Sequence, residues 1–339
     1  MRRPHPTKRF STFHRKFTDG VTPGDGTRVT VEELRHLRAD SIRLANTPRD
    51  AVTSLFPGAY RALFRGRGLE FDEVRPYQSG DDYRTLDWRV TARTGQLHTK
   101  LFHEEREHTL YLLVDAGSSM QFGTRVQYKW VLAARIAAIV TWLAVENGDR
   151  VGAIVYGDGL NCHISPPLTG EAGAMRVFSL LAGIKDHAHD RHSTLGDGML
   201  RLRKLAKPGS MILVLSDFYE LDRSARRHLS YLARHNDMAV VHIYDPIEKQ
   251  LPTDGVYSIT DGTSTTSFDG TQRSVQEQYS QLFQQRSEQL QHLSKRYQTR
   301  LLSLGTHQTL VESLQQALFP GTASSRGKDL KPTRRNGNA

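Results

Sequence analysis

The sequence contains a single cysteine, Cys162, among its 339 residues. One thiol cannot form a disulfide within the chain or a cluster of thiolate metal ligands. Long apolar runs are also absent, because the most apolar stretch, residues 130–145, is shorter than a bilayer span and carries Arg135. The N-terminus lacks the apolar core of a signal peptide. These absences predict a cytoplasmic protein without a membrane span.

Several catalytic motifs are missing as well. The chain has no Gly-x-x-x-x-Gly-Lys loop to cradle phosphates and no Gly-x-Ser-x-Gly elbow to present a nucleophile. His103 and His108 flank a charged run, but their spacing does not match the two histidines that a zinc protease places on one helical face. The sequence therefore predicts neither ATP hydrolysis by the usual route nor a zinc site at these histidines.

Positive charge is concentrated at the two ends of the chain. The formal net charge is +10, and residues 1–20 and 326–339 hold eleven basic residues against two acidic ones. We expect residues 1–26 and 321–339 to form flexible basic arms. Binding of nucleic acid through these arms is an alternative interpretation.

Residues 27–107 predict a helix followed by a charged, β-leaning extension. Thr30 and Glu33 form a capping-box pattern, and the helix that follows has one narrow apolar face made of Leu34, Leu37, Ser41 and Leu44. In residues 68–93, acidic and basic residues alternate around aromatic ones. This segment is either an ion-paired layer packed on the next domain or a docking surface for a partner.

Residues 108–320 alternate between strand and helix patterns, which is typical of a parallel sheet covered by helices on both faces. We predict strands at residues 110–115, 151–156, 162–164, 211–217, 238–244 and 300–304. Helices are predicted at residues 127–147, 171–181, 195–205 and 223–234, with a long helix from a Ser274–Glu277 capping box and a last helix capped by Thr309 and Glu312. The turn at residues 157–159 makes the 162–164 strand an antiparallel edge. The expected fold is α/β and doubly wound, with a mostly parallel sheet.

Two of the buried strands end in a carboxylate. Asp115 follows an apolar run and precedes Ser119, and Asp217 follows a second apolar run. The ends of parallel strands meet at one sheet edge, where α/β proteins bind ligands. With Thr194 from a third loop, these residues supply only oxygen donors, which suit Mg²⁺, Mn²⁺ or Ca²⁺. The sequence therefore predicts a cation site made of Asp115, Ser119, Thr194 and Asp217.

This constellation resembles the metal-ion-dependent adhesion site of von Willebrand factor type A domains, in which an Asp-x-Ser-x-Ser loop, a Thr and a later Asp hold the ion. The resemblance implies a Rossmann-like, von Willebrand type A-like domain over residues 108–320. It also implies that a partner's carboxylate completes the metal shell. Gly117 stands where the pattern has its middle serine, so one hydroxyl ligand is missing and we expect weak ion binding.

A narrower resemblance is to the domain-of-unknown-function-58 family. It is carried by Arg75-Pro-Tyr-x-x-Gly-Asp-Asp-x-Arg-x-x-Asp-Trp88, by the 115–123 loop, by Ser216-Asp-Phe218 and by Asp245-Pro-Ile-Glu248. That resemblance implies an association with MoxR-type AAA+ ATPases, which are thought to act as chaperones that mature other complexes.

The leading hypothesis is a non-enzymatic interaction protein that works with such an ATPase or its client. A Mg²⁺-dependent phosphoester hydrolase is an alternative, since two carboxylates and a metal can perform that chemistry. The sequence disfavours it, because no general base and no Lys or Arg clamp accompanies the site motifs.

Overall fold

The computed structural model describes residues 25–45, 74–78, 86, 88–100, 108–158, 161–184, 193–253, 255–260, 265–311 and 313–314. The two predicted basic arms lie outside these residues, except for residues 25 and 26. The nucleic-acid interpretation therefore concerns residues that lie almost entirely outside the described part of the chain.

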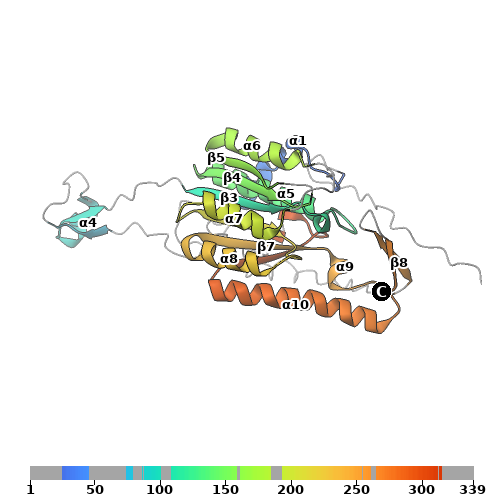
Figure 1. The fold of residues 1–339 in the computed structure, drawn as a ribbon. Helices are drawn as coiled ribbons and strands as arrows, with labels where there is room; N and C mark the ends of the chain where they lie inside the picture. The colour runs from blue at the N-terminus through green and yellow to red at the C-terminus, as the bar shows by residue number, and fades with distance from the viewer. Residues whose placement is uncertain are drawn as a thin grey trace, which may run out of the picture.

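A six-stranded sheet forms the centre of the molecule (Figure 1). The strand order is β10-β7-β6-β3-β4-β5, and every neighbouring pair is parallel except β4 and β5. The strands are β3 (Thr109–Asp115), β4 (Arg150–Tyr156), β5 (His163–Leu168), β6 (Met211–Ser216), β7 (Asp237–Tyr244) and β10 (Arg300–Gly305). The predicted α/β fold with one antiparallel edge is confirmed.

Both faces of the sheet are covered, as the near-continuous apolar strands require. Along β3, Leu110, Leu112 and Val114 enter one hydrophobic core, and Tyr111 and Leu113 enter the other. Helices α1 (Val31–His36), α2 (Arg38–Ala45), α5 (Lys129–Glu146) and α6 (Gly170–Ala182) contribute to the first core. Helices α7 (Leu195–Leu205), α8 (Arg223–His235) and α10 (Arg273–Tyr297) contribute to the second.

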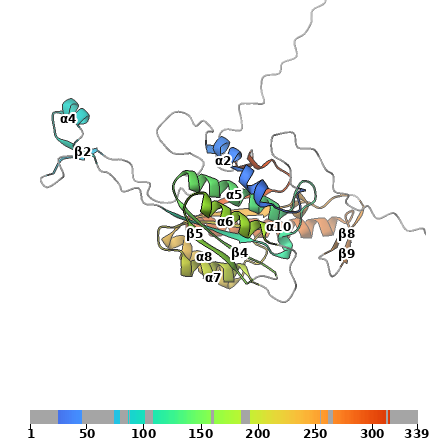
Figure 2. The same ribbon diagram turned by 90° about the horizontal axis from the view of Figure 1, so that it is seen from above.

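The N-terminal helical segment packs on the first face of the sheet, close to α5 and α6 (Figure 2). Thr30 caps α1 as predicted, because its hydroxyl accepts a hydrogen bond from the Glu33 amide. The predicted apolar face, Leu34, Leu37, Ser41 and Leu44, is buried. A fully buried leucine stabilises a fold by about 1.5–3 kcal/mol, so these side chains contribute more than the cap.

Helix α5 differs from the prediction in which of its residues face the sheet. We expected Trp130, Ala134, Ala137, Ala138 and Trp142 to form a sheet-facing stripe, but the helix is buried on almost every side. Trp142 faces away from the sheet, since its Nε1 donates to the Leu34 carbonyl and its ring meets Phe178 of α6 edge-on. The reason is that α1 and α2 lie over α5, and α6 packs beside it on the sheet.

The C-terminal part of the domain departs from the sequence pattern in two ways. The predicted Ser274–Glu277 capping box is wrong, because α10 begins at Arg273 after Gln272 and has no side-chain cap. Only Leu290 of α10 is fully buried, and Leu282 is 61% exposed. A hairpin of β8 (Val256–Thr260) and β9 (Thr265–Asp269) occupies part of the segment expected to be a loop. The predicted last helix is helical at Leu310, and Glu312 lies outside the described residues.

Much of residues 68–93 also lies outside the described residues. The described part contains β1 (Val74–Pro76), which pairs with β2 (His98–Lys100), and α4 (Trp88–Thr94). Figures 1 and 2 show this small unit apart from the six-stranded sheet, and Trp88 is 67% exposed. The packed-layer and docking-surface interpretations both concern a segment that lies largely outside the described residues.

Beneath α10, His242 of β7 lies in an aromatic cluster with Phe218, Tyr244 and Phe283. Its side chain is 1% exposed, and burial lowers its pKa from 6.5 to about 4. Between these two pH values the unfolded chain binds a proton that the folded chain does not, so stability falls as the pH drops through this window.

We expect His242→Phe to make the acid-induced loss of stability shallower between pH 6.5 and 4, by up to about 3 kcal/mol. Urea denaturation at a series of pH values measures this, with the exposed His163→Phe as the control. Parallel pH profiles for the wild type and His242→Phe would contradict the assignment.

Candidate functional site at the switch point of the sheet

The direction of chain connection reverses between β3 and β6. Strand β3 leads through α5 to β4 on one side, whereas β6 leads through α8 to β7 on the other. At such a point the loops at the carboxyl ends of the two strands diverge and leave a crevice, which is where α/β proteins bind ligands. Asp115 ends β3, and Asp217 follows the last residue of β6.

Asp115 is buried at this point, with 8% of its surface exposed. One carboxylate oxygen accepts a hydrogen bond from the Gly117 amide at 2.9 Å, and the other accepts one from the Ser216 hydroxyl at 2.6 Å. Burial, and then the nearby charge of Asp217, raise the pKa of Asp115 to about 7. The Tyr156 hydroxyl is buried beside the same carboxylate. The environment therefore disfavours the charged form of Asp115, and a cation beside the carboxylate would stabilise that form.

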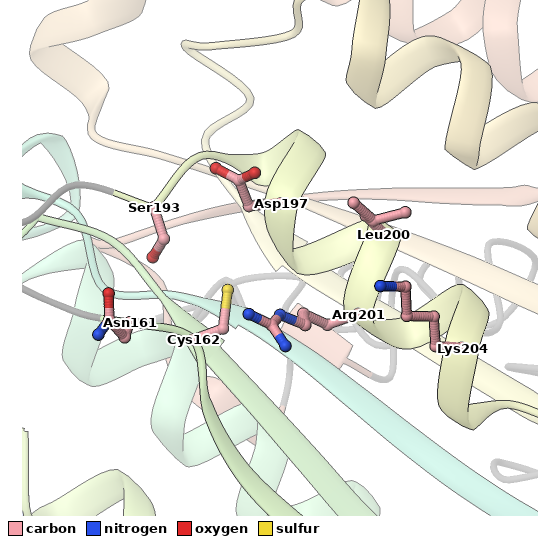
Figure 3. A pocket seen from close by; sticks show the side chains of 7 residues that line it. All are labelled: Asn161, Cys162, Ser193, Asp197, Leu200, Arg201 and Lys204. Atoms are coloured by element: carbon pink, nitrogen blue, oxygen red, sulfur yellow. The ribbon is translucent and has the colours of Figure 1, made fainter.

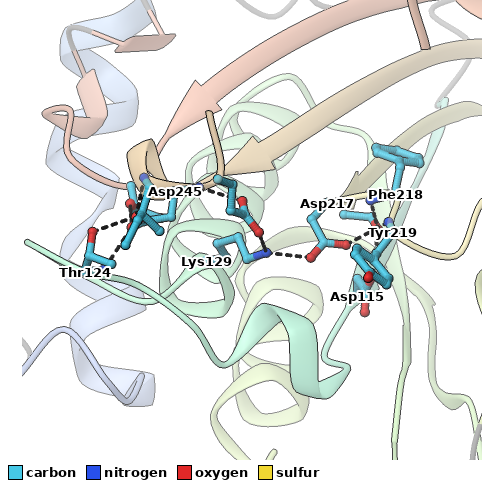
Figure 4. A network of polar contacts seen from close by, with 11 residues as sticks. Asp115, Thr124, Lys129, Asp217, Phe218, Tyr219 and Asp245 are labelled. Carbon is cyan, nitrogen blue, oxygen red and sulfur yellow. Dashed lines mark hydrogen bonds and ion pairs between the residues drawn. The ribbon is translucent and has the colours of Figure 1, made fainter. Parts of the chain in front are cut away.

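Asp217 is buried too, but it has a cationic partner. The Lys129 ammonium donates to Asp217 Oδ2 at 2.6 Å and to Glu248 Oε1 at 2.7 Å (Figure 4). Burial is the largest influence and would raise the pKa of Asp217, but the Lys129 charge and the hydrogen bonds to the carboxylate together lower that pKa. The Ser119 hydroxyl and the Tyr219 amide also bond to this carboxylate.

Asp245 extends the network to the other end of the sheet edge (Figure 4). It is completely buried and accepts hydrogen bonds from the Thr124 amide and hydroxyl, the Ile247 amide and the Thr306 hydroxyl. Glu248 closes a capping box on helix α9 (Pro246–Lys249) by accepting from the Asp245 amide at 2.9 Å. Glu248 links this motif to the ion pair of Lys129 and Asp217.

Loops from the other strands join the two carboxylates. The Ser118 amide donates to Asp158 at 2.7 Å, and the Ser193 hydroxyl bonds to both backbone groups of Gly157. We call residues 115–119, 157–158, 193–194 and 216–219 the rim. Their mutual hydrogen bonds show that loops distant in sequence meet at this edge, as the sequence predicts.

The backbone after Asp217 is unusual. Phe218 has a φ of 53°, which is uncommon for a residue other than glycine. Its side chain is buried, whereas the next side chain, Tyr219, is 67% exposed. The Arg286 guanidinium of α10 lies 4.6 Å from the Tyr219 ring centroid. Strained conformations of this kind cluster at binding sites.

Of the four predicted ligands, the structure brings Asp115, Ser119 and Asp217 together. Thr194 lies on the rim, but its hydroxyl is engaged in the cap of α7, where it donates to the Asp197 carboxylate and accepts from the Asp197 amide. Within the described residues, no cluster of three or more His, Cys, Asp or Glu side chains is arranged to hold a metal. A resident ion would therefore have two carboxylates and hydroxyl groups as its protein ligands.

The donor set nevertheless fits a hard divalent cation. Mg²⁺ needs only one or two carboxylates from the protein and retains several waters. Asp115, Asp217 and Glu248 would carry three negative charges against the single ammonium of Lys129. A buried excess of negative charge is costly, and a divalent cation next to Asp115 would neutralise it.

A separate open pocket of about 340 Å³ lies beside the rim (Figure 3). It is lined by Asn161, Cys162, Ser193, Asp197, Leu200, Arg201 and Lys204, and by none of the four predicted ligands. Burial raises the pKa of Cys162, so this thiol is not an activated nucleophile.

Sequence reasoning missed Lys129, although a signal was present. Lys129 is the first residue of a helix that is otherwise almost wholly apolar, where the positive end of the helix dipole disfavours a cation. Such a residue requires carboxylate partners. Its presence also corrects the statement that no Lys accompanies the site motifs. At 1% exposure, however, the Lys129 side chain is shielded from a substrate in solvent.

The described part of the chain contains no helix that is both long enough and apolar enough to span a membrane. Fold and site together define an α/β protein with a buried charge cluster at the switch point of a doubly wound sheet. The chain belongs to the family described as "Protein of unknown function DUF58", whose model matches residues 73–289.

Similar proteins include uncharacterized protein Rv1480 of Mycobacterium tuberculosis, which is 30% identical over 218 residues, covering 64% of this chain and 68% of the relative. Uncharacterized protein YeaD of Bacillus subtilis is 49% identical over 88 residues, covering 26% of this chain and 20% of the relative. Among solved structures, the conserved hypothetical protein BatB from Bacteroides thetaiotaomicron matches with a TM-score of 0.40 and 16% identity, covering 62% of this chain and 97% of the other.

Proposed function

We propose that the chain is a non-enzymatic protein-interaction module whose rim binds an acidic side chain of a partner through a divalent cation. The observation that carries the proposal is the buried charge cluster at the switch point. In it, the Lys129 ammonium pairs with Asp217 and Glu248, whereas the neighbouring Asp115 carboxylate accepts from the neutral Gly117 amide and Ser216 hydroxyl. A divalent ion and a partner's carboxylate would together complete the charge balance. The ion is Mg²⁺, with Mn²⁺ or Ca²⁺ as substitutes.

Asp115 and Ser119 would hold the ion, and Asp217, already bonded to Lys129, would act in an outer position. Thr194 would serve through a water, because its own hydroxyl is engaged in the helix cap. When bound, the ion supplies a Lewis-acidic contact for an incoming carboxylate. The protein residues fix the two carboxylates, exclude solvent from Asp217 and present the loops around them.

The partner that we propose is a MoxR-type AAA+ ATPase or one of its client proteins, and the module would assist that ATPase in assembling other proteins. The resemblance to the domain-of-unknown-function-58 family, which implies an association with such ATPases, supports this choice. The exposed Tyr219, held by the strained turn beside Asp217, supports a protein rather than a small molecule as the ligand, because exposed tyrosines are enriched in protein interfaces.

The test is capture of the purified cognate ATPase by the full-length chain. We expect EDTA and Asp115→Asn each to reduce capture at least about tenfold, since each removes the ion-mediated contact. Asp115→Asn preserves the size of the side chain and serves better than a truncation.

A gain-of-function variant sharpens this test. A β-carbon on Gly117 would lie 3.2 Å from Asp115 Oδ1 and 3.8 Å from Asp158 Oδ2, so a hydroxyl at this position faces the carboxylates. Gly117→Ser should increase Mg²⁺-dependent capture, and the matched Gly117→Ala should not. Capture that ignores EDTA, Asp115→Asn and Gly117→Ser would exclude the proposed ion contact.

A further inference from the structure

Lys129 is a buried ammonium that joins three separate elements of the fold. It begins α5, Asp217 follows β6, and Glu248 belongs to α9. The side chains of Lys129 and Asp217 are each 1% exposed. Both bonds of the ammonium are short and charge-assisted, which is the strong class of hydrogen bond.

Burying the Lys129 ammonium costs free energy, so the ammonium requires matched partners. A buried ammonium loses its hydration, and the N-terminal turn of a helix adds unfavourable positive potential. Two carboxylates offset these costs, and they raise the pKa of Lys129 despite its burial. Glu248 also accepts a hydrogen bond from the Asp245 amide, so the second carboxylate is held from both sides.

The position of Lys129 makes the surroundings of Asp217 and Asp115 unequal. On the Asp217 side, the ammonium already occupies the place where a cation would approach Oδ2. On the Asp115 side, the carboxylate accepts hydrogen bonds only from neutral donors, the Gly117 amide and the Ser216 hydroxyl. An added ion is thus repelled from the Asp217 side and attracted to the Asp115 side.

We infer that Lys129 is a built-in cation that substitutes for metal at Asp217, confines an added divalent ion to the Asp115 side and weakens its binding. This inference rests on the proposed function, because it assigns the regulation of the same site. The ligand class is a hard divalent cation whose affinity is set by one protein charge. Replacement of Lys129 by a neutral side chain would turn a weak site into a strong one.

The test compares Lys129→Met with the wild type by Mn²⁺ titration, followed by electron paramagnetic resonance of the free ion. Removing one buried positive charge should tighten Mn²⁺ binding by roughly tenfold to a hundredfold. The thermal midpoint of Lys129→Met should fall without Mn²⁺ and recover with it. Lys207→Met, an exposed replacement with the same charge change, should behave as the wild type.

A second variant covers the case in which Lys129→Met does not fold without metal. Glu248→Gln retains the ammonium but removes one of its two carboxylates, so Lys129 serves Asp217 alone. Mn²⁺ binding to Glu248→Gln should be weaker than to the wild type. Equal or tighter binding by this variant would overturn the inference.

The outcomes separate the inference from the proposed function. If the wild type binds Mn²⁺ and Lys129→Met binds it no more tightly, the role of Lys129 is refuted and the ion-dependent rim stands. If only Lys129→Met binds Mn²⁺, the inference is supported and ion-dependent capture by the natural chain is refuted. If neither binds, both are refuted.

Discussion

Replacing Asp245 with alanine should lower the free energy of unfolding by about 3–5 kcal/mol. The carboxylate is completely buried and accepts from Thr124, Ile247 and Thr306 at 2.5–3.1 Å. Alanine would leave these donors without an acceptor, and each unsatisfied buried group costs about 1–3 kcal/mol. Urea denaturation followed by circular dichroism measures the loss.

Thr124→Val is the matched control, because it removes one hydroxyl donor and keeps the acceptor. It should cost only about 1 kcal/mol. Asp245→Asn should lie between the two, since it keeps the shape and one carbonyl oxygen. A loss for Asp245→Ala no larger than that for Thr124→Val would show that the carboxylate does not organise this part of the edge.

Asp245→Ala should also disturb the contact between Glu248 and Lys129. The Asp245 backbone and side chain hold the first turn of α9, which positions Glu248 against Lys129. Loosening α9 removes one of the two carboxylates that stabilise the buried ammonium. The Asp245–Glu248 motif is therefore connected to the candidate site through packing rather than through direct contact with a ligand.

The architecture could be predicted from the sequence because its strands are unambiguous. Strands β3 and β6 are continuous apolar runs, and this pattern indicates strands that are buried on both faces. The turn at Gly157 and Asp158 predicted the antiparallel edge, and β5 pairs there. Carboxylates placed directly after buried strands then predicted that Asp115 and Asp217 would meet at one edge.

Other features depended on tertiary packing that a local pattern does not contain. The α5 stripe was assigned to the sheet because nothing in the sequence indicates a second helical layer over Trp142. Helix α10 has apolar residues along one face, but it lies at the periphery and leaves Leu282 exposed. The β8–β9 hairpin is rich in Ser and Thr, so it lacks the apolar alternation that predicts strands.

The candidate site, too, was predicted only in part from the sequence. Side chains at strand ends were predicted, whereas Lys129 and Glu248 were not, because each lies on a helix whose packing direction was unknown. A lysine in the first helical turn is usually solvated. Only the three-dimensional meeting of α5, β6 and α9 makes this one a buried partner of two carboxylates.

Gly157→Ala should destabilise the fold by at least about 3 kcal/mol and should weaken Mn²⁺ binding at the rim. Gly157 has a φ of 149°, and a β-carbon there would lie 2.5 Å from the Gly117 amide nitrogen and 2.6 Å from the Ala116 carbonyl carbon. These are backbone atoms, so relief requires the loop after Asp115 to move. That movement would break the hydrogen bond from Gly117 that orients the Asp115 carboxylate.

Gly209→Ala separates backbone strain from steric displacement. Gly209 also has a positive φ, of 85°, but a β-carbon there meets nothing within 4 Å. It should cost only about 1–2 kcal/mol and leave Mn²⁺ binding unchanged. Chemical denaturation and Mn²⁺ titration of both variants provide the comparison. Equal losses of stability and equal ion affinities for the two glycine variants would contradict this prediction. The close approach of the 116–117 and 157 backbones would then not determine the geometry of the rim.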